Sequence, residues 1–296
     1  MIKGRYDRIF DIVNYLITIA VCAIVVIPLI SILANSFSSP DLVYFGEVRL
    51  IPKGFTLATY KQVITYDDYA ILNGFKNTII YTFFGTLISM TLTFLAAYPL
   101  SRKDLKGRGL FMTLFVITMF FNGGLIPTFL VVKSLGLYNR MLGVILPGAL
   151  SVYNMIIVRT YMQSSIPYEL QEAAMIDGCS NFRLFLVIIL PLCKPMIAIM
   201  VLFYAVGYWN SYYNALIYLQ DEAREPIQIV LRRLFSQTKS GGLSTGNTST
   251  SGTELAKQAE AMQYAVIVVA MAPILCIYPF LSKYFERGLM VGSLKG

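Results

Sequence analysis

Six long stretches of this chain contain no charged residue. They cover residues 12–40, 77–101, 109–132, 141–158, 195–220 and 261–282. About 20 apolar residues are enough for a helix to cross a bilayer, and a helix satisfies its own backbone polar groups there. The composition agrees, because 56% of the 296 residues are apolar and only 14% are charged, whereas a soluble domain carries roughly a quarter charged residues. The sequence therefore predicts an all-α integral membrane protein with six transmembrane helices.

The predicted spans form a single membrane domain over residues 1–296. Their approximate bounds are 12–36, 72–101, 109–132, 140–161, 184–218 and 262–285. The fifth span begins near Leu184 provided that Lys194 is sheltered or extends its charge to the interface. The first apolar run exceeds the roughly 7–15 residues of a signal-peptide core, and no clear cleavage site follows it, so we expect it to remain as a span.

Basic residues indicate how the spans are oriented. With both termini in the cytoplasm, the cytoplasmic loops hold 12 Lys or Arg in 57 residues, and the opposite loops hold 11 in 84. Short cytoplasmic loops carry the excess of basic residues in membrane proteins, and the loop 102–108 contains four of them. The net charge of +8 has the same explanation, so no nucleic-acid partner is expected.

Two long segments, 37–71 and 219–261, then lie outside the membrane on the extracytoplasmic side. The second includes a Ser/Thr/Gly-rich stretch, 240–253, whose composition is typical of a flexible linker. Each segment fits a slack surface loop as well as a loop that faces a substrate or a partner.

The histidine, cysteine and carboxylate arrangements that are typical of catalytic or metal sites do not occur in this sequence. It contains no histidine, which excludes Ser-His-Asp catalysis and most metal sites with histidine ligands. The four cysteines form no CxxC pair, so we expect neither a metal site nor a disulfide framework. Since no carboxylate cluster or activated nucleophile takes their place, we expect no catalytic residue and no enzymatic activity.

The most informative segment is the predicted cytoplasmic loop 162–183. Pro167 suits the first turn of a helix, where its missing N–H costs nothing. Glu169 and Glu172 follow near the start of that helix, where the helix dipole favours acids. Gly178 is expected to end the helix, because glycine readily adopts the left-handed conformation.

Two further features complete this loop. Asn181 is expected to cap the next helix. Ala173 and Ala174 leave a shallow surface that another protein can approach closely. The loop is therefore predicted to present a short exposed helix that is tied to a transmembrane helix.

The spacing in this loop resembles the EAA motif of binding-protein-dependent ABC importer permeases. Glu172-Ala173-Ala174 is followed after three residues by Gly178, after nine more by Ile188, and after one more by Leu190-Pro191. All seven fixed positions and all three spacings of the motif agree.

Other segments are similar to the maltose-type permease subunits of carbohydrate importers. These are the entry to the fifth span at 190–195, the Trp209-Asn210 element and the C-terminal segment 285–296. The segments 122–127 and 146–154 resemble the subgroup that imports complex oligosaccharides and polysaccharide fragments. The resemblance covers residues 10–296 and departs from the family in the stretch 240–253.

This resemblance implies a type I ABC importer permease fold, in which the EAA helix is the coupling helix that docks on a cytoplasmic ATPase. By position, the ATPase contact falls on Glu172, Ala173, Ala174, Asp177 and Gly178. The tail residues Gly292, Lys295 and Gly296 resemble tails that reach the ATPase interface. The chain has no GxxxxGK[ST] phosphate loop, so ATP and Mg would be bound by the separate ATPase and no cofactor by this chain.

The resemblance also implies the partners. One six-span chain is half of a pore, and the other half would be a second, paralogous permease subunit, with a homodimer as the less expected arrangement. A cytoplasmic ABC ATPase dimer would drive transport, and an extracytoplasmic solute-binding protein would deliver a sugar. The location implied is the bacterial cytoplasmic membrane.

A candidate substrate path lies in the predicted span 184–218. Trp209 and Tyr213, like Asn210 and Asn214, are four residues apart and would share neighbouring helix faces. Aromatic rings stack on sugars and amides bind hydroxyls, but the same residues also fit an aromatic belt at the membrane interface. Further candidates are Asn122, Tyr153 and Asn154, although intramembrane amides more often join helices.

Three other functions are compared with the residues of this chain. An ion-coupled secondary transporter usually has ionisable residues inside its spans, whereas the six apolar stretches contain none and Lys194 lies near the cytoplasmic end of the fifth span. A membrane-embedded enzyme would need a cluster of catalytic groups. A scaffold subunit of a membrane complex is compatible with the composition but does not require the EAA spacing.

Overall fold

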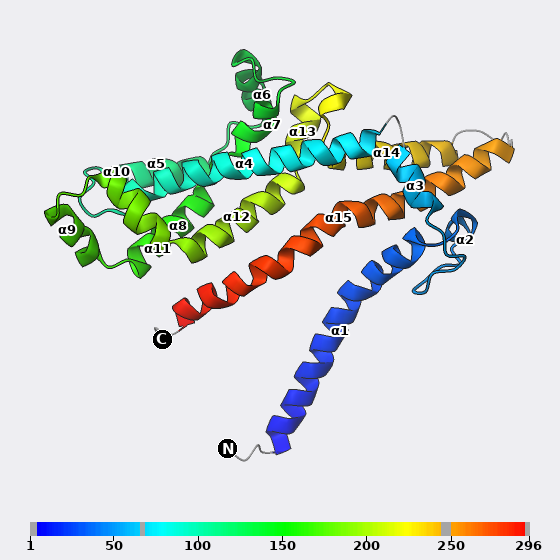
Figure 1. The fold of residues 1–296 in the computed structure, drawn as a ribbon, viewed down its shortest axis with the longest axis horizontal. Coiled ribbons are helices and arrows are strands. Elements are labelled where there is room, and N and C mark those ends of the chain that lie inside the picture. Colours follow the sequence, from blue (N-terminus) through cyan, green and yellow to red (C-terminus); the bar gives the residue numbers. More distant parts are fainter. Residues whose placement is uncertain (1–4, 66–68, 244–249, 294–296) are drawn as a thin grey trace. The chain divides into compact units, whose positions relative to one another are not determined.

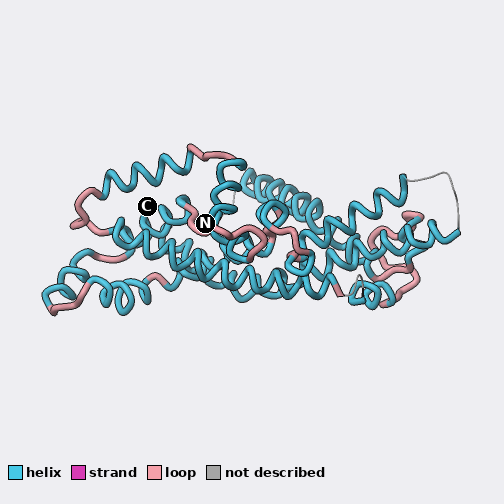
Figure 2. The backbone as a smooth tube through the Cα atoms, turned by 90° about the horizontal axis from the view of Figure 1, so that it is seen from above, coloured by secondary structure: helices cyan, strands magenta, loops and turns pink. Residues whose placement is uncertain are grey.

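The structure is a computed structural model that describes residues 5–65, 69–243 and 250–293. All regular elements in these ranges are helices, and none of the described residues lies in a strand (Figure 2). The all-α fold predicted from the sequence is confirmed.

Long helices alternate with short ones along the chain. In order they are α1 (Arg5–Ser36), α2 (Pro40–Tyr44), α3 (Ala58–Thr65), α4 (Ala70–Ser101), α5 (Arg108–Phe120), α6 (Leu125–Ser134), α7 (Met141–Ile145), α8 (Val152–Ser165), α9 (Tyr168–Ile176), α10 (Asn181–Leu184), α11 (Leu190–Leu192), α12 (Lys194–Trp209), α13 (Tyr213–Tyr218), α14 (Ile227–Leu243) and α15 (Thr250–Ser293). Short 3-10 helices lie at Leu146–Gly148 and Glu222–Arg224, and a π-helical segment, Phe185–Ile189, joins α10 to α11.

Three helical stretches in the described ranges are long and apolar enough to cross a membrane alone. They are Ile9–Ser36, Ala70–Ser101 and Ala256–Cys276. Three pairs of shorter helices meet the same criterion only when each pair is taken together. Counting each pair as one span gives up to six spans, and the exact number stays a prediction.

The three pairs bend sharply, so the predicted spans 109–132, 140–161 and 184–218 are not single straight helices. The helices of the first pair, α5 and α6, meet at 112°. The second pair bends by 55° between Gly148 and Val152, and the third bends by 83° at Cys193.

Glycine and proline explain where these bends fall. Gly124 precedes α6 with φ of +87°, a conformation that costs glycine little and other residues much. Pro147 and Gly148 precede the bend before α8. Pro191 and Pro195 flank Cys193, and proline cannot donate the backbone hydrogen bond that a continuous helix needs.

The predicted outer segments contain more helix than expected. Of the stretch 240–253, residues 240–243 end α14 and residues 250–253 begin α15, whereas 244–249 lie outside the described residues. The linker interpretation is therefore wrong at both ends of the stretch. At the start of α15, helix extends into the stretch because the segment after Thr253 is rich in Glu, Ala, Lys and Gln, which favour helix.

Contacts group the chain into two compact units. The first comprises Met1–Ile71 and Val230–Ala272, and the second comprises Leu72–Ile229 and Pro273–Gly296. In the first unit, Ala34, Val43 and Val48 form a small apolar core against which Tyr264 packs. Lys257 adds an ion pair, with Nζ at 2.7 Å from Asp41 Oδ1.

The second unit has the larger core. Buried residues of α4, α8 and α10–α12 form it, among them Phe94, Met155, Ile189 and Met200. The short helices α9 and α10 lie at the C-terminal end of α4 (Figure 1). This arrangement places the loop with the EAA spacing against the end of a long apolar helix.

Candidate functional site

The helix α9 carries the EAA spacing and ends at the predicted glycine. Gly178 has φ of +78°, its N–H donates to the carbonyl of Met175, and the N–H of Cys179 donates to the carbonyl of Ala174, each at 3.0 Å. These two bonds form a Schellman motif, the usual way in which a glycine ends a helix. The predicted helix end is confirmed.

The predicted helix starts were each wrong by one residue. Pro167 is the N-cap of α9 and not a residue of its first turn. The N-cap of α10 is Ser180, whose hydroxyl accepts a hydrogen bond from the N–H of Arg183 at 3.4 Å, and Asn181 is the first helical residue. Sequence patterns place helix ends only to within a residue or two.

One face of α9 is open and the other is buried in the second unit. Glu172, Ala173, Asp177 and Gly178 are exposed. Ala174 is only 8% exposed and belongs to the unit's own core. The expectation that Ala173 and Ala174 both form an open surface is therefore wrong for Ala174. A short helix such as α9 is stabilised by packing one face against the rest of the protein, and Ala174 lies on that face.

Ile176 is a residue of this surface that the sequence analysis missed. It lies in the last turn of α9 and is 86% exposed. The sequence feature that could have identified it is an isoleucine directly before the polar helix end at Asp177 and Gly178. An apolar side chain at this exposure adds a contact point for a partner next to the acidic residues.

Arg102 fixes the loop to the end of α4. Its side chain is 6% exposed, and it bonds to Asp104 through Nε–Oδ1 at 2.8 Å and Nη2–Oδ2 at 2.7 Å. Its Nη2 also lies 3.2 Å from the sulfur of Met175 in α9, and its Nη1 lies 3.2 Å from the hydroxyl of Tyr98. The hydrogen bonds with Asp104 raise the pKa of Arg102 and lower the pKa of Asp104.

Tyr98 and Arg159 extend this attachment. The hydroxyl of Tyr98 donates to the carbonyl of Asn181 at 3.3 Å, and its ring lies 4.9 Å from that of Phe185. The guanidinium of Arg159 in α8 donates to the carbonyl of Leu100 at 2.9 Å. Direct contacts thus join the end of α4 to α8, to α9 and to the segment that follows α9.

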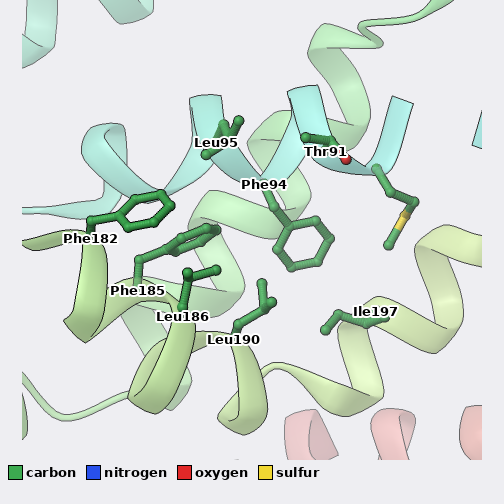
Figure 3. A pocket seen from close by; sticks show the side chains of 9 residues that line it. Thr91, Phe94, Leu95, Phe182, Phe185, Leu186, Leu190 and Ile197 are labelled. Carbon is green, nitrogen blue, oxygen red and sulfur yellow. The ribbon is translucent and has the colours of Figure 1, made fainter. Parts of the chain in front are cut away.

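An apolar pocket of about 350 Å³ lies between α4 and the helices that follow the loop (Figure 3). Phe94 and Leu95 line it from α4, and Phe182, Phe185 and Leu186 line it from the opposite side. The π-helical segment contains Phe185 and Leu186, and such segments often occur at functional sites.

The predicted substrate face on one continuous helix is wrong. The helix α12 ends at Trp209, and α13 begins only at Tyr213, so the pairs four residues apart do not share a helix face. Trp209 is buried and lines an apolar groove of about 690 Å³ along α4. Asn214 lines a different, smaller cavity, and its amide donates to the carbonyl of Val144 at 3.3 Å.

The other candidate path residues lie apart from this groove. Asn210 is exposed and donates to the carbonyl of Val206 at 3.0 Å, and Tyr213 is 59% exposed. Asn122 accepts a hydrogen bond from the N–H of Gly124 in the bend between α5 and α6. In α8, Tyr153 is 59% exposed and Asn154 is 9% exposed.

A row of hydroxyl residues on α4 was missed by the sequence analysis. Thr78, Thr82, Thr86, Ser89 and Thr93 recur at the helical period, which is the signal that could have revealed them. Ser89 and Thr93 bond to the hydroxyls of two α12 tyrosines at 2.8 and 2.6 Å. The hydroxyls of Thr82 and Thr86 are buried, have no partner among the described residues, and line the same groove as Trp209.

The predicted tail lies at the edge of what the structure describes. Gly292 is in the last turn of α15, and Lys295 and Gly296 lie outside the described residues. In the part of the chain that is described, no group of three or more His, Cys, Asp or Glu side chains is arranged to hold a metal ion.

Comparisons with known proteins agree with this architecture. A family model described as the binding-protein-dependent transport system inner membrane component matches residues 89–291. The chain is 42% identical to Protein LplC of Bacillus subtilis, covering 100% of this chain and 98% of that protein. It is also 42% identical to the polygalacturonan/rhamnogalacturonan transport system permease protein YtcP of the same organism, covering 98% and 99%.

A solved structure shares the fold. It is a crystal structure of a bacterial ABC transporter involved in the import of the acidic polysaccharide alginate, and one of its chains matches with a TM-score of 0.86 and 31% identity, covering 96% of this chain and 99% of that one. The chain therefore belongs to the family of binding-protein-dependent transport system inner membrane components, and it is an integral membrane permease subunit of an ABC transporter and not an enzyme.

Proposed function

We propose that this chain forms one half of the translocation pore of an ATP-driven importer for an oligosaccharide or a polysaccharide fragment. The observation that carries this proposal is the surface of α9, where Glu172, Ala173, Asp177 and Gly178 are exposed on a helix that is anchored from behind. A separate ABC ATPase, which binds ATP and Mg, would dock on this surface.

The anchoring explains how motion would pass from the ATPase to the pore. Ala174 is packed into the core, and Met175 contacts the buried guanidinium of Arg102. Because Arg102 directly follows α4, a displacement of α9 would move the end of that helix. The packing of Phe185 against Tyr98 gives a second connection to the same helix.

The remaining partners and the orientation follow from the family. A paralogous permease subunit would complete the pore, with six spans in each half, and an extracytoplasmic solute-binding protein would deliver the solute. The coupling loop and both termini would face the cytoplasm, where Gly292, Lys295 and Gly296 would reach the ATPase interface.

A sugar is the substrate class that the groove along α4 supports. The names of two similar proteins specify polysaccharides, polygalacturonan/rhamnogalacturonan and alginate. In this chain, Trp209 lines the same groove as Thr82 and Thr86, whose hydroxyls have no partner among the described residues. An aromatic face with nearby hydroxyls suits a sugar, whose C–H faces are apolar and whose edges form hydrogen bonds. Asn122, Tyr153, Asn154, Asn210, Tyr213 and Asn214 are the further candidates for the path.

The first test is to purify the chain from its native membrane in mild detergent and identify its partners by mass spectrometry. The proposal expects an ABC ATPase and a second permease in a constant ratio. Recovery of the chain alone, with uptake that does not need ATP, would contradict it.

The second test concerns the coupling loop. The change Gly178→Asp places a charged side chain on the exposed end of α9, and a Cβ there meets no atom within 4 Å. We expect loss of ATP-driven uptake with normal membrane insertion. The matched control is Gly136→Asp, at a glycine with φ of +67° and equally open space outside the coupling loop. Equal uptake by both variants would refute the assignment of the loop.

A further inference from the structure

A polar cavity of about 630 Å³ lies at the start of α9. It forms where α4 and α8 end and α5 begins, between Ser101 at the end of α4, Arg108 at the start of α5, and Ser164 and Ser165 at the end of α8. Its volume is in the range of small-molecule sites. The predicted spans 72–101 and 109–132 have their ends beside Ser101 and Arg108, which would place the cavity near the depth of lipid headgroups.

One wall of this cavity is suited to an anion. The first N–H groups of α9 have no acceptor inside the helix, and the N-cap residue Pro167 provides no side-chain cap. Lys103 Nζ lies 4.8 Å from the centre of the Tyr168 ring, at the same helix start. Arg108, which also lines the cavity, uses Nη1 to bond the carbonyl of Arg102 and retains further donors. Helix N-termini beside basic side chains bind phosphate groups.

The other wall offers acceptors. Gln171 is 7% exposed and lines the cavity, and its Oε1 is buried with no hydrogen-bond partner among the described residues. An unpaired polar atom at this burial is costly, and Oε1 is therefore an acceptor open to a ligand that can donate a hydrogen bond. Glu169 adds a carboxylate to the lining. A bare phosphate would leave Gln171 Oε1 unpaired and would face Glu169, whereas hydroxyl groups would donate to both.

We propose that this cavity binds a phosphate ester of a polyhydroxy alcohol. The phosphate would lie at the start of α9 between Lys103 and Arg108, and the hydroxyls would donate to Gln171 and Glu169. A phosphatidylglycerol headgroup and a soluble glycerol phosphate share this chemistry. Glu172, Asp177 and Gly178 do not line the cavity, so this ligand and the ATPase would contact different residues of α9.

The experiment uses the full chain with the partners that co-purify with it. In one arm, nanodiscs contain phosphatidylglycerol and phosphatidylcholine, and native mass spectrometry measures which lipid stays bound. In the other arm, nanodiscs contain phosphatidylcholine only, and calorimetry measures binding of glycerol 3-phosphate. The variants are Lys103→Gln and Gln171→Leu, and the control is Lys106→Gln, an exposed basic residue of the same loop that does not line the cavity.

Retention of phosphatidylglycerol over phosphatidylcholine would support the lipid source, and saturable binding of glycerol 3-phosphate would support the soluble one. In either case we expect Lys103→Gln, which removes a hydrogen bond to the charged phosphate, to weaken binding at least about tenfold. Gln171→Leu removes a hydrogen bond to a neutral hydroxyl and should weaken binding by up to about tenfold, and Lys106→Gln should leave binding unchanged. Gln171→Leu keeps the side-chain volume and removes the unpaired atom, so the variant is expected to fold. The proposal would be overturned if neither phosphatidylglycerol nor glycerol 3-phosphate bound, or if Lys106→Gln weakened binding as much as the two variants.

Discussion

Arg102 and Asp104 form an ion pair with two parallel hydrogen bonds, at 2.8 and 2.7 Å. The two side chains differ in exposure, at 6% for Arg102 and 49% for Asp104. A surface carboxylate thus holds a buried guanidinium, which also contacts Met175 of α9. This pair is one of the contacts that hold the loop with the EAA spacing at the end of α4.

Replacing Arg102 by Gln should destabilise the loop. The change removes hydrogen bonds of a buried charged group, each worth about 1.5–3 kcal/mol at most, although the exposure of Asp104 reduces the value of the ion pair. We expect a loss of about 1–3 kcal/mol of stability, measured as earlier thermal unfolding and faster hydrogen exchange in residues 168–179. Lys106→Gln, in the same loop, should leave both unchanged, and an unaltered exchange rate in Arg102→Gln would contradict this role.

The same pair predicts a dependence on pH. Arg102 lowers the pKa of Asp104 below its ordinary value of 3.8, so the folded state favours the charged carboxylate. The stabilisation is complete above the ordinary value and is lost as the pH falls through the lower folded pKa. Thermal unfolding between about pH 6 and about pH 2 should therefore show a loss of stability below the ordinary pKa that is smaller in Asp104→Asn. If the unfolding temperature fell equally with pH in the unmodified chain and in Asp104→Asn, this prediction would be wrong.

Gly85 of α4 permits the close approach of α12. A Cβ at this position would lie 2.8 Å from three ring atoms of Tyr208, whose hydroxyl bonds to Ser89 at 2.8 Å. Gly85→Ala should displace that ring and cost about 1–3 kcal/mol, measured by thermal unfolding in detergent. The control is Gly207→Ala in α12, where a Cβ meets nothing within 4 Å. If Gly207→Ala lowered the stability as much as Gly85→Ala, the loss would come from the backbone and not from the ring contact.

The contact between α4 and α12 also rests on paired hydroxyls. Thr93 and Tyr204 bond through their hydroxyls at 2.6 Å and are both buried. A double-mutant cycle of Thr93→Val and Tyr204→Phe should give a coupling energy of about 0.6–1.7 kcal/mol, the range found between membrane helices. Thr91→Val, on the exposed side of α4, should show no coupling with Tyr204→Phe. If the effects of Thr93→Val and Tyr204→Phe on stability were additive, the hydrogen bond between the two hydroxyls would be refuted.

The groove beside Trp209 can be tested with transport. Thr82→Val and Thr86→Val keep the side-chain volume and remove the two unpaired hydroxyls. If these groups contact the sugar, the KM for uptake of a galacturonate oligomer should rise about tenfold per hydrogen bond lost, while ATP hydrolysis without solute stays unchanged. Thr91→Val on the same helix is the control. Wild-type KM in both variants would remove the groove from the substrate path.

Trp209 offers an independent signal, because it is the only tryptophan of the chain. Its side chain is buried beside the ring of Phe75, with a centroid distance of 6.2 Å. Binding of a galacturonate oligomer in the groove should change its emission, and Thr82→Val should weaken that response. A response that survives in Thr82→Val and Thr86→Val would place the sugar elsewhere.

The sequence by itself determined the class of the protein and the form of the loop that carries the EAA spacing. Uncharged runs longer than a bilayer crossing leave an all-α membrane protein as the solution. The local motif from Glu172 to Gly178 fixed a helix and its end, because a glycine in the left-handed conformation depends only on its neighbours. These features follow from hydropathy and local backbone chemistry, which can be read along the chain.

Only the tertiary structure decided which side chains face which neighbour. Arg102 reads as one more basic residue of a cytoplasmic loop, yet it is buried beneath α9. Ala174 and Ala173 are adjacent and chemically identical, and only packing makes one of them a core residue. The break after Trp209 separates four residues that periodicity would join. Burial and partners depend on contacts between segments far apart in the chain, and no local pattern records them.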